Sequence, residues 1–299
     1  MVPSAISHIT SAHEGGDQLG NGFPETNGQL DTNGHSSDQG YNGHLAHSQD
    51  EPLDLICIGF GPASLAIAIA INDLYKLSPS LPQPKVLFLE KQSQFAWHAG
   101  MQLPGAKMQI SFLKDLATPR DPRSKFTFLN YLFENGRLNQ FINLGTFLPT
   151  RVEYEDYLRW CAKHFEREGK VAYDMEVEGV KIGERSKDGR VAGFTVSARD
   201  QRGDLVTRRA GHVVIAVGGR PVIPQSLQGL KHVAHSSQFA TIISNIQQRV
   251  AGRPPRFAVV GSGQSAAEIF NDLWERFPDS QVKLVIKGAS LRPNDDSPL

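Results

Sequence analysis

The distribution of hydrophobic residues divides the chain at about residue 50. Before that point Gly, Asn, Ser, His and Asp dominate, and apolar positions show almost no periodicity. Such a segment cannot bury enough apolar surface to offset the entropy lost on ordering it. From Leu53 onward, apolar runs alternate with amphipathic stretches. We therefore predict a disordered tail over residues 1–50, whose histidines show no metal-ligand spacing, followed by a folded α/β region.

The folded region opens with a predicted βαβ unit. Apolar runs indicate strands over Leu53–Ile58 and Lys85–Glu90, and small apolar residues indicate a closely packed helix over Ala63–Tyr75. The turn between the first strand and the helix carries three small residues at the positions that a dinucleotide-binding turn requires, Gly59, Gly61 and Ser64. Such a turn can hold a pyrophosphate against the helix N-terminus. Glu90 ends the second strand, where an acid bonds a ribose hydroxyl, so this site suits FAD.

A second unit of the same kind begins about 200 residues later. Strands are predicted over Phe257–Val260 and Gln281–Ile286, with a helix over Ser265–Phe277 between them. Its turn carries Gly261, Gly263, Gln264, Ser265 and Ala266. Here the second strand is followed by a base, Lys287, which suits a 2′-phosphate and so favours NADPH over NADH. Arg292 could assist it, and the alternative for Lys287 is a solvated surface lysine.

Between the two units the pattern is mixed. Residues 94–122 are loop-like, amphipathic helices are predicted over Phe126–Glu134 and Glu153–Glu168, and short strands fill Val171–Val214. A further strand, His212–Gly219, is expected to close the first nucleotide domain. The fold class is therefore α/β with two Rossmann-like dinucleotide-binding domains. We place an incomplete FAD-binding domain at 51–219 and the N-terminal part of an NADPH-binding domain at 220–299, because only two strands of the latter precede Leu299.

Composition narrows the function classes. The formal net charge is zero, so no overall electrostatic attraction favours nucleic acid or an anionic membrane. The longest apolar stretch, Ala63–Ile71, is too short to span a bilayer, and no secretory signal is readable. The two cysteines, Cys57 and Cys161, form no CxxC motif, which argues against a dithiol redox enzyme and fits a reducing, cytoplasmic compartment. No metal site is expected.

Several segments give the chain a more specific resemblance, to the fungal L-ornithine N5-monooxygenases of siderophore biosynthesis. The resemblance covers roughly residues 52–299 and rests on the two glycine turns together with Phe95–His98, Lys107–Leu116, Asp121–Ser124, Phe126–Leu132 and Arg292–Pro298. It implies an enzyme in which NADPH reduces FAD, the reduced flavin activates O2, and the neutral side-chain amine of L-ornithine is hydroxylated for later acylation into a hydroxamate. The flavin would carry the difficult step, and the protein would supply orientation and a dry pocket.

The resemblance also implies roles for individual residues. Lys114 would bind the substrate carboxylate, and Gln109 would lie beside the flavin ring and help hold the activated oxygen. Met108 would lie against the flavin ring, Trp97 and His98 would line the flavin site, and Arg151 would reach the cofactor region. Ser265 and Lys287 would hold NADPH. From the residues alone, each has a plainer alternative: core packing for Met108 and Trp97, a surface pair with Asp115 for Lys114, and solvation for Arg151.

Rival functions remain open at this stage. The substrate could be L-lysine or another diamine, because the family's substrate-gripping asparagines fall beyond Leu299. A truncated, non-catalytic remnant is the other alternative, and impaired turnover is expected for the chain as written. By resemblance the protein would be a homo-oligomer, specifically a tetramer.

Overall fold

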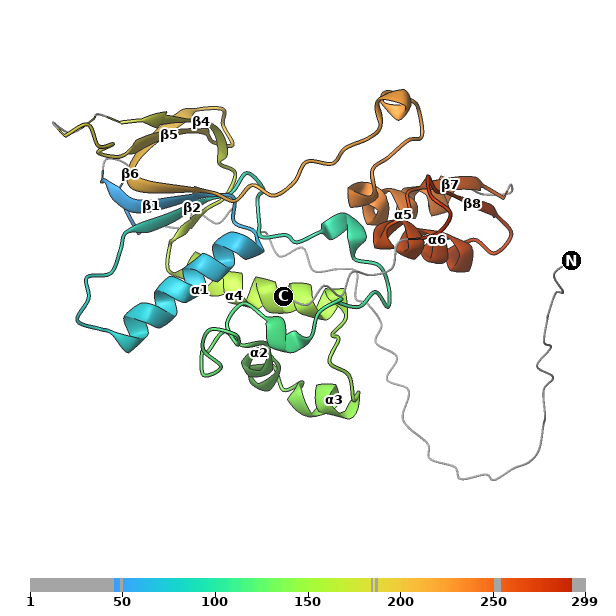
Figure 1. Ribbon diagram of the computed structural model, residues 1–299, viewed down its shortest axis with the longest axis horizontal. Coiled ribbons are helices and arrows are strands. Elements are labelled where there is room, and N and C mark those ends of the chain that lie inside the picture. The colour runs from blue at the N-terminus through green and yellow to red at the C-terminus, as the bar shows by residue number, and fades with distance from the viewer. Residues whose placement is uncertain (1–45, 49–50, 184, 186–187, 250–253, 292–299) are drawn as a thin grey trace, which may run out of the picture. The chain divides into compact units, whose positions relative to one another are not determined.

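The described residues form two sheets, a mixed sheet of six strands and a parallel pair of strands (Figure 1). The computed structural model describes residues 46–48, 51–183, 185, 188–249 and 254–291, all within one compact unit. The predicted disordered tail lies outside the described residues except for 46–48, where the Ala46 N–H donates to the Gly169 carbonyl at 3.0 Å. Arg292 and the segment after it also lie outside.

Six strands form the sheet in the order β3-β2-β1-β6-β5-β4. Their bounds are Leu53–Ile58 (β1), Val86–Leu89 (β2), Val171–Ala172 (β3), Glu176–Ile182 (β4), Phe194–Arg199 (β5) and Leu205–Ile215 (β6). Strand β1 pairs in parallel with both β2 and β6, while β5 pairs antiparallel with β4 and β6. The predicted α/β class is confirmed, and β1, which leads into the first glycine turn, lies in the parallel half of the sheet.

Strand β6 differs from the prediction of short strands with a separate one over His212–Gly219. It is one continuous strand of 11 residues. Its first half pairs antiparallel with β5 up to Ala210, and its second half pairs in parallel with β1 from Ala210 to Ile215. The strand is long because it changes neighbours midway, which links the antiparallel and parallel halves of the sheet.

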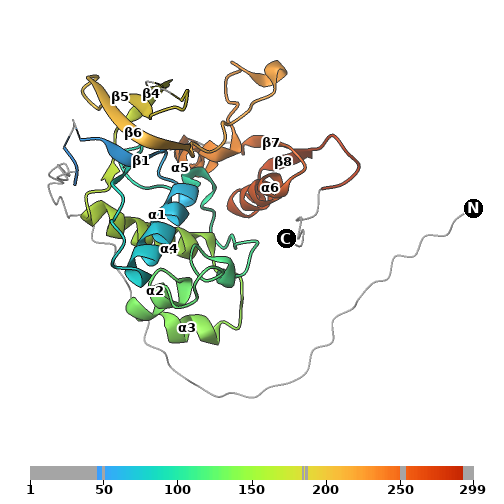
Figure 2. The ribbon, with the colours of Figure 1, turned by 60° about the vertical axis from the view of Figure 1, so that its left-hand side comes forward.

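Helices cover one face of the parallel strands. Helix α1 (Pro62–Leu77) and helix α4 (Arg151–Arg167) lie side by side there, and α2 (Phe128–Glu134) packs against α4 with α3 (Leu138–Asn143) next to it (Figures 1 and 2). Helix α4 is capped by the Thr150 side chain, which accepts the Glu153 N–H at 3.2 Å. Its apolar face buries residues at helical spacing, namely Tyr154, Tyr157, Leu158, Cys161 and Phe165.

The second βαβ unit forms as predicted. Strands β7 (Arg256–Val260) and β8 (Gln281–Val285) pair in parallel, with α6 (Gln264–Arg276) connecting them. A helix that the sequence pattern did not indicate, α5 (Phe239–Arg249), contributes Phe239 and Ile243 to the same core. That core also contains Met101 and Leu103, which lie more than 130 residues earlier in the chain. The boundary at 219/220 stays a prediction, but packing crosses it.

Within the described ranges, no helix is long and apolar enough to cross a bilayer. The same residues contain no group of three or more His, Cys, Asp or Glu side chains arranged to hold a metal ion.

Both cysteines are free thiols buried in the main core. Burial raises the pKa of Cys57 to about 11 and raises the pKa of Cys161 as well. A thiolate is the reactive form of cysteine, so neither side chain is a nucleophile at neutral pH.

Because the folded protein holds the Cys57 proton until about pH 11, stability should fall above pH 9. An unfolded chain releases that proton near its ordinary pKa of 9.0. Below pH 9 the thiol is protonated in both states, so Cys57 makes its full contribution to the free energy of unfolding. As the pH rises from 9 to 11 only the unfolded chain loses the proton, which lowers the free energy of unfolding by about 2–3 kcal/mol. Urea unfolding of wild type and Cys57→Ala at pH 8, 9.5 and 11 measures it. Equal pH dependence in the two proteins would contradict the expectation.

Candidate functional site

The first glycine turn connects β1 to α1 at the carboxyl end of the sheet. Gly59 has φ +89°, and its N–H donates to the Leu89 carbonyl at 2.8 Å. A Cβ at this position would lie 2.6 Å from the backbone oxygen of Ala216. Ser64 is buried and its hydroxyl donates to the Gly59 carbonyl at 2.6 Å. Ser64 therefore holds the turn in shape, and only glycine fits at position 59.

Gly61 has a different role in the same turn. It is the N-cap of α1, and Pro62 follows at the first helical position. A Cβ on Gly61 would meet nothing within 4 Å. The first N–H groups of a helix have no partners within the helix and carry the positive end of its dipole. Open space at Gly61 therefore leaves room for a phosphate to approach closely.

Glu90 lies at the carboxyl end of β2, next to this turn. Its side chain is buried, with one carboxylate oxygen accepting the Phe60 N–H at 2.7 Å and the other the Gln92 N–H at 2.9 Å. Each carboxylate oxygen has a second lone pair. The structure thus places Glu90 beside the glycine turn with lone pairs that remain for a ribose hydroxyl, and the ribose contact stays a prediction.

The second glycine turn repeats the arrangement at the start of α6. Gly261 has φ +143°, and its N–H donates to the Val285 carbonyl at 2.9 Å. Gly263 is the N-cap of the helix, and a Cβ added there would meet nothing within 4 Å. Ser265 lies exposed in the first turn of α6, and Lys287 lies exposed just beyond β8. Over the ranges that the structure describes, Lys287 makes no ion pair. This turn also has the open cradle that a phosphate requires.

The segment expected to face the flavin and substrate is held by backbone pairing with the chain before α4. The Met108 N–H donates to the Pro149 carbonyl at 2.8 Å and the Phe112 N–H to the Phe147 carbonyl at 2.9 Å. Met108 is half-buried against the main core, whereas Gln109 and Lys114 are exposed. The structure therefore presents Gln109 and Lys114 on one anchored segment.

Asp115 anchors the end of this segment, which the sequence analysis did not foresee. The carboxylate is 7% exposed and accepts four hydrogen bonds of 2.6–2.9 Å. Three come from the backbone N–H groups of Ala117, Thr118 and Phe128, and the fourth from the Thr118 hydroxyl. Asp115 is thus fully engaged, and no ion pair to Lys114 occurs among the described residues. The alternative of a surface Lys114–Asp115 pair is wrong.

Trp97 and His98 follow the loop after β2. The Trp97 ring is half-buried against the main core, 5.8 Å from the Tyr154 ring and 5.1 Å from the His98 ring, measured between centroids. His98 is exposed and has φ +46°. Trp97 therefore has core contacts of its own, and its predicted place beside the flavin stays a prediction.

Arg151 begins helix α4, and its guanidinium is engaged. It makes two hydrogen bonds of 2.8 Å to the carboxylate of Glu268 on α6. The alternative of a solvated charge is thus wrong, because only 14% of the Arg151 side chain is exposed. The sequence analysis did not single out Glu268, because it lies 117 residues from Arg151 along the chain and only the fold brings the two together.

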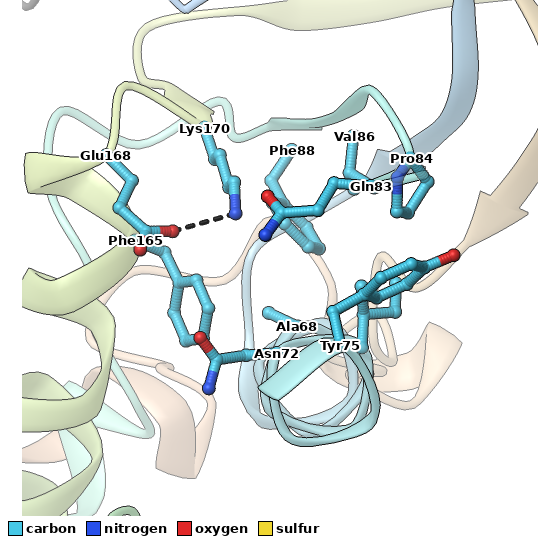
Figure 3. Close-up of a pocket in the computed structure, with 11 residues that line it drawn as sticks. Ala68, Asn72, Tyr75, Gln83, Pro84, Val86, Phe88, Phe165, Glu168 and Lys170 are labelled. Carbon is cyan, nitrogen blue, oxygen red and sulfur yellow. Dashed lines mark ion pairs between the residues drawn. The ribbon is translucent and has the colours of Figure 1, made fainter. Parts of the chain in front are cut away.

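A pocket between α1, α4 and β2 lies away from both glycine turns. Figure 3 shows it lined by Phe88, Phe165 and Ala68, with the Lys170 ammonium 2.7 Å from the Glu168 carboxylate at one side. It opens beside Pro84, at the amino end of β2, whereas the glycine turn and Glu90 lie at the carboxyl end. Nucleotides bind at the carboxyl ends of parallel strands, so this pocket is not the predicted dinucleotide site.

Comparison with known proteins places the chain in a family. The family model described as L-lysine 6-monooxygenase/L-ornithine 5-monooxygenase matches residues 51–299. An L-ornithine N(5)-monooxygenase of Cochliobolus heterostrophus is 53% identical over 85% of this chain and 50% of its own length.

Solved structures agree. Ornithine hydroxylase PvdA from Pseudomonas aeruginosa is 39% identical with a TM-score of 0.73, over 83% of this chain and 58% of that one. Kutzneria sp. 744 ornithine N-hydroxylase KtzI, with reduced FAD, NADP+ and L-ornithine, is 36% identical with a TM-score of 0.73, over 83% of this chain and 56% of that one. The chain spans about half the length of the curated relatives it matches. With two glycine turns and a family match over the whole folded region, the chain belongs to the L-lysine 6-monooxygenase/L-ornithine 5-monooxygenase family.

Proposed function

We propose that this chain carries the FAD and NADPH sites of a monooxygenase that hydroxylates the side-chain amine of L-ornithine, using NADPH and O2. One observation carries the proposal: two helices, α1 and α6, each begin at a glycine turn with open space at the N-cap glycine. Family membership and the ornithine-specific names of relatives above 50% identity favour ornithine over lysine or another diamine.

The proposed cofactor residues fall into two groups. For FAD they are Gly59, Gly61, Ser64, Glu90, Trp97, His98, Met108 and Gln109, with Arg151 nearby. For NADPH they are Gly261, Gly263, Gln264, Ser265 and Lys287. KtzI, a relative whose structure holds reduced FAD, NADP+ and L-ornithine, supports the choice of cofactors. Lys287 is an exposed cation at the end of β8, where a 2′-phosphate would lie.

Each group of residues has a physical task. The bound flavin would supply electron transfer and oxygen activation. The helix N-termini would bind the pyrophosphates, Glu90 would orient a ribose, and Gln109 would donate or accept a hydrogen bond beside the flavin. The Lys114 ammonium, which has no ion pair among the described residues, would hold the substrate carboxylate and leave the side-chain amine free to react.

Further proposals concern the use of the product, the cellular compartment and the oligomeric state of the enzyme. We infer that the product supplies hydroxamate siderophore biosynthesis, which the name of a Beauveria bassiana relative supports. Two free buried thiols support a reducing, cytoplasmic location. Assembly into a homo-oligomer, a tetramer by family resemblance, is proposed on that resemblance alone.

The first test is the visible absorption spectrum of the purified 299-residue chain with FAD, before and after NADPH is added without oxygen. A bound-flavin band that bleaches faster with NADPH than with NADH is the expected result. Admission of air and L-ornithine should then yield N5-hydroxyornithine at the impaired turnover expected of this chain. Lys114→Met should keep the bleaching but raise the ornithine KM about 100-fold, the loss expected for one charged hydrogen bond. An exposed lysine elsewhere, Lys181, provides the matched control. A protein that binds no flavin would contradict the proposal.

A further inference from the structure

The ion pair between Arg151 and Glu268 joins the two nucleotide-binding units. Arg151 is the first residue of α4, which packs under the main sheet, and Glu268 lies in α6 of the second unit. Both guanidinium Nη atoms lie 2.8 Å from carboxylate oxygens, one on each oxygen. Only 14% of the Arg151 side chain and 19% of the Glu268 side chain are exposed. Two parallel bonds fix orientation as well as distance, so the contact resists both rotation and translation.

The Arg151 end of the pair is itself tied to a segment that crosses between the units. The Arg151 N–H donates to the Ala106 carbonyl at 2.8 Å, and its Nη1 lies 3.4 Å from the Met101 carbonyl. Met101 belongs to the core of the second unit, together with Phe239 of α5. Gly100 comes so close to the backbone of that unit that a Cβ would lie 1.7 Å from the Ser237 oxygen. Arg151 therefore lies where side chains of the two nucleotide-binding units pack against each other.

The Glu268 end leads to the second glycine turn. The Gln264 side-chain amide donates to Glu268 Oε1 at 2.7 Å, and Gln264 is the residue directly after the N-cap, Gly263. One carboxylate oxygen thus accepts from Arg151 and from Gln264. A short chain of charge-assisted hydrogen bonds runs from the start of α4 to the start of α6, where the pyrophosphate of the second nucleotide is proposed to bind.

We propose that Arg151 and Glu268 are positioning residues whose ion pair fixes the orientation of the second dinucleotide turn relative to the first. Hydride transfer requires the donor and acceptor atoms to approach within about 3–3.5 Å, so two cofactors on separate units react only when the units are held in register. This functional consequence rests on the proposed function, whereas the orienting role of the pair does not. Glu268 takes two of the five guanidinium N–H donors and fixes where the guanidinium lies, so in this proposal Arg151 acts through Glu268, near the FAD site but without needing a contact to the flavin.

Distances between spin labels test the orienting role without any cofactor. Exposed Lys163 on α4 and exposed Lys283 on β8 can be replaced by cysteine and labelled, because the native Cys57 and Cys161 are buried. The wild-type background should give one narrow distance distribution, and Glu268→Gln should broaden or shift it. The same distribution in both proteins would overturn the proposal.

A matched control exists within α6. Asp272 and Arg276 form a bidentate pair of the same chemistry with bonds of 2.6 and 3.0 Å, but both residues lie on one helix. Asp272→Asn should therefore leave the label distance unchanged. A shift as large as that of Glu268→Gln would mean that any charge lost from α6 disturbs the units, and would also overturn the proposal.

Stopped-flow reduction of bound flavin by NADPH tests the consequence. Arg151→Met and Glu268→Gln should each lower the limiting rate constant about tenfold or more, with the NADPH Kd within twofold of wild type. The double variant should be no slower than the slower single variant, as expected for residues that act through one interaction. If Arg151→Met abolished flavin binding while Glu268→Gln changed nothing, Arg151 would contact the cofactor directly and the proposal would fail. A wild-type chain that NADPH does not reduce would refute the proposed function, and the label distances would still decide the orienting role.

Discussion

Gly61→Ala should lower FAD affinity about 100-fold without destabilising the chain. A Cβ at Gly61 meets no protein atom within 4 Å, and the residue has an extended backbone with φ −87°, which alanine adopts freely. Its only effect is therefore to place a methyl group in the space where the phosphate would approach the α1 N-terminus. Losing the close, charge-assisted contact costs about 2–3 kcal/mol, which corresponds to a change in Kd of roughly 30- to 150-fold. Flavin fluorescence titration gives the affinity, and thermal unfolding of the flavin-free protein gives the stability.

Substitutions at two other glycines distinguish loss of the phosphate contact from steric clash and from backbone strain. Gly59→Ala combines φ +89° with a Cβ 2.6 Å from the Ala216 oxygen, so it should destabilise the flavin-free chain itself. Gly105→Ala has φ +71° but open space, so it isolates backbone strain and should cost about 1 kcal/mol with normal FAD affinity. Normal FAD binding by Gly61→Ala would show that the first turn is not the phosphate site.

Local pattern predicted the elements that surround both glycine turns. Strand β1 has the bounds predicted for it, and α1, α4, α6 and β8 begin or end within about two residues of prediction, because apolar periodicity and turn residues are local signals. The open cradles at Gly61 and Gly263 follow from the same local geometry. This part of the candidate site could thus be derived from the sequence.

What escaped prediction depends on partners far away in the chain. Strand β6 is long because it pairs with β5 and then with β1, and neither pairing is visible in its own residues. Met101 and Leu103 occur in a segment without regular periodicity, yet they complete a core formed mostly after residue 238. The Arg151–Glu268 pair spans 117 residues, so charge alone could not distinguish it from two solvated side chains. Contacts between residues so far apart in the chain can be identified only once the fold is known.

Asp115 is the clearest case, and replacing it should have the largest effect on stability. Asp115→Ala would leave three backbone N–H groups, those of Ala117, Thr118 and Phe128, without their acceptor. Each buried unsatisfied donor costs about 1–3 kcal/mol, and partial access of water reduces the sum to about 3–5 kcal/mol. Urea unfolding at neutral pH should show this loss as a lower midpoint with an unchanged slope.

The matched control is Asp200, whose carboxylate accepts the N–H groups of Arg202 and Asp204 at 2.9 and 2.8 Å in a surface turn. Water can replace that carboxylate, so Asp200→Ala should cost about 1 kcal/mol or less. Because the Asp115 bonds reach both the loop after Lys114 and the start of α2, Asp115→Ala should also displace the segment that presents Gln109 and Lys114. A loss from Asp115→Ala no greater than that from Asp200→Ala would mean that the loop relaxes to satisfy its own backbone. In that case the exposed position of Lys114 would be set by the pairing of residues 106–112 with 147–151 and not by the buried carboxylate.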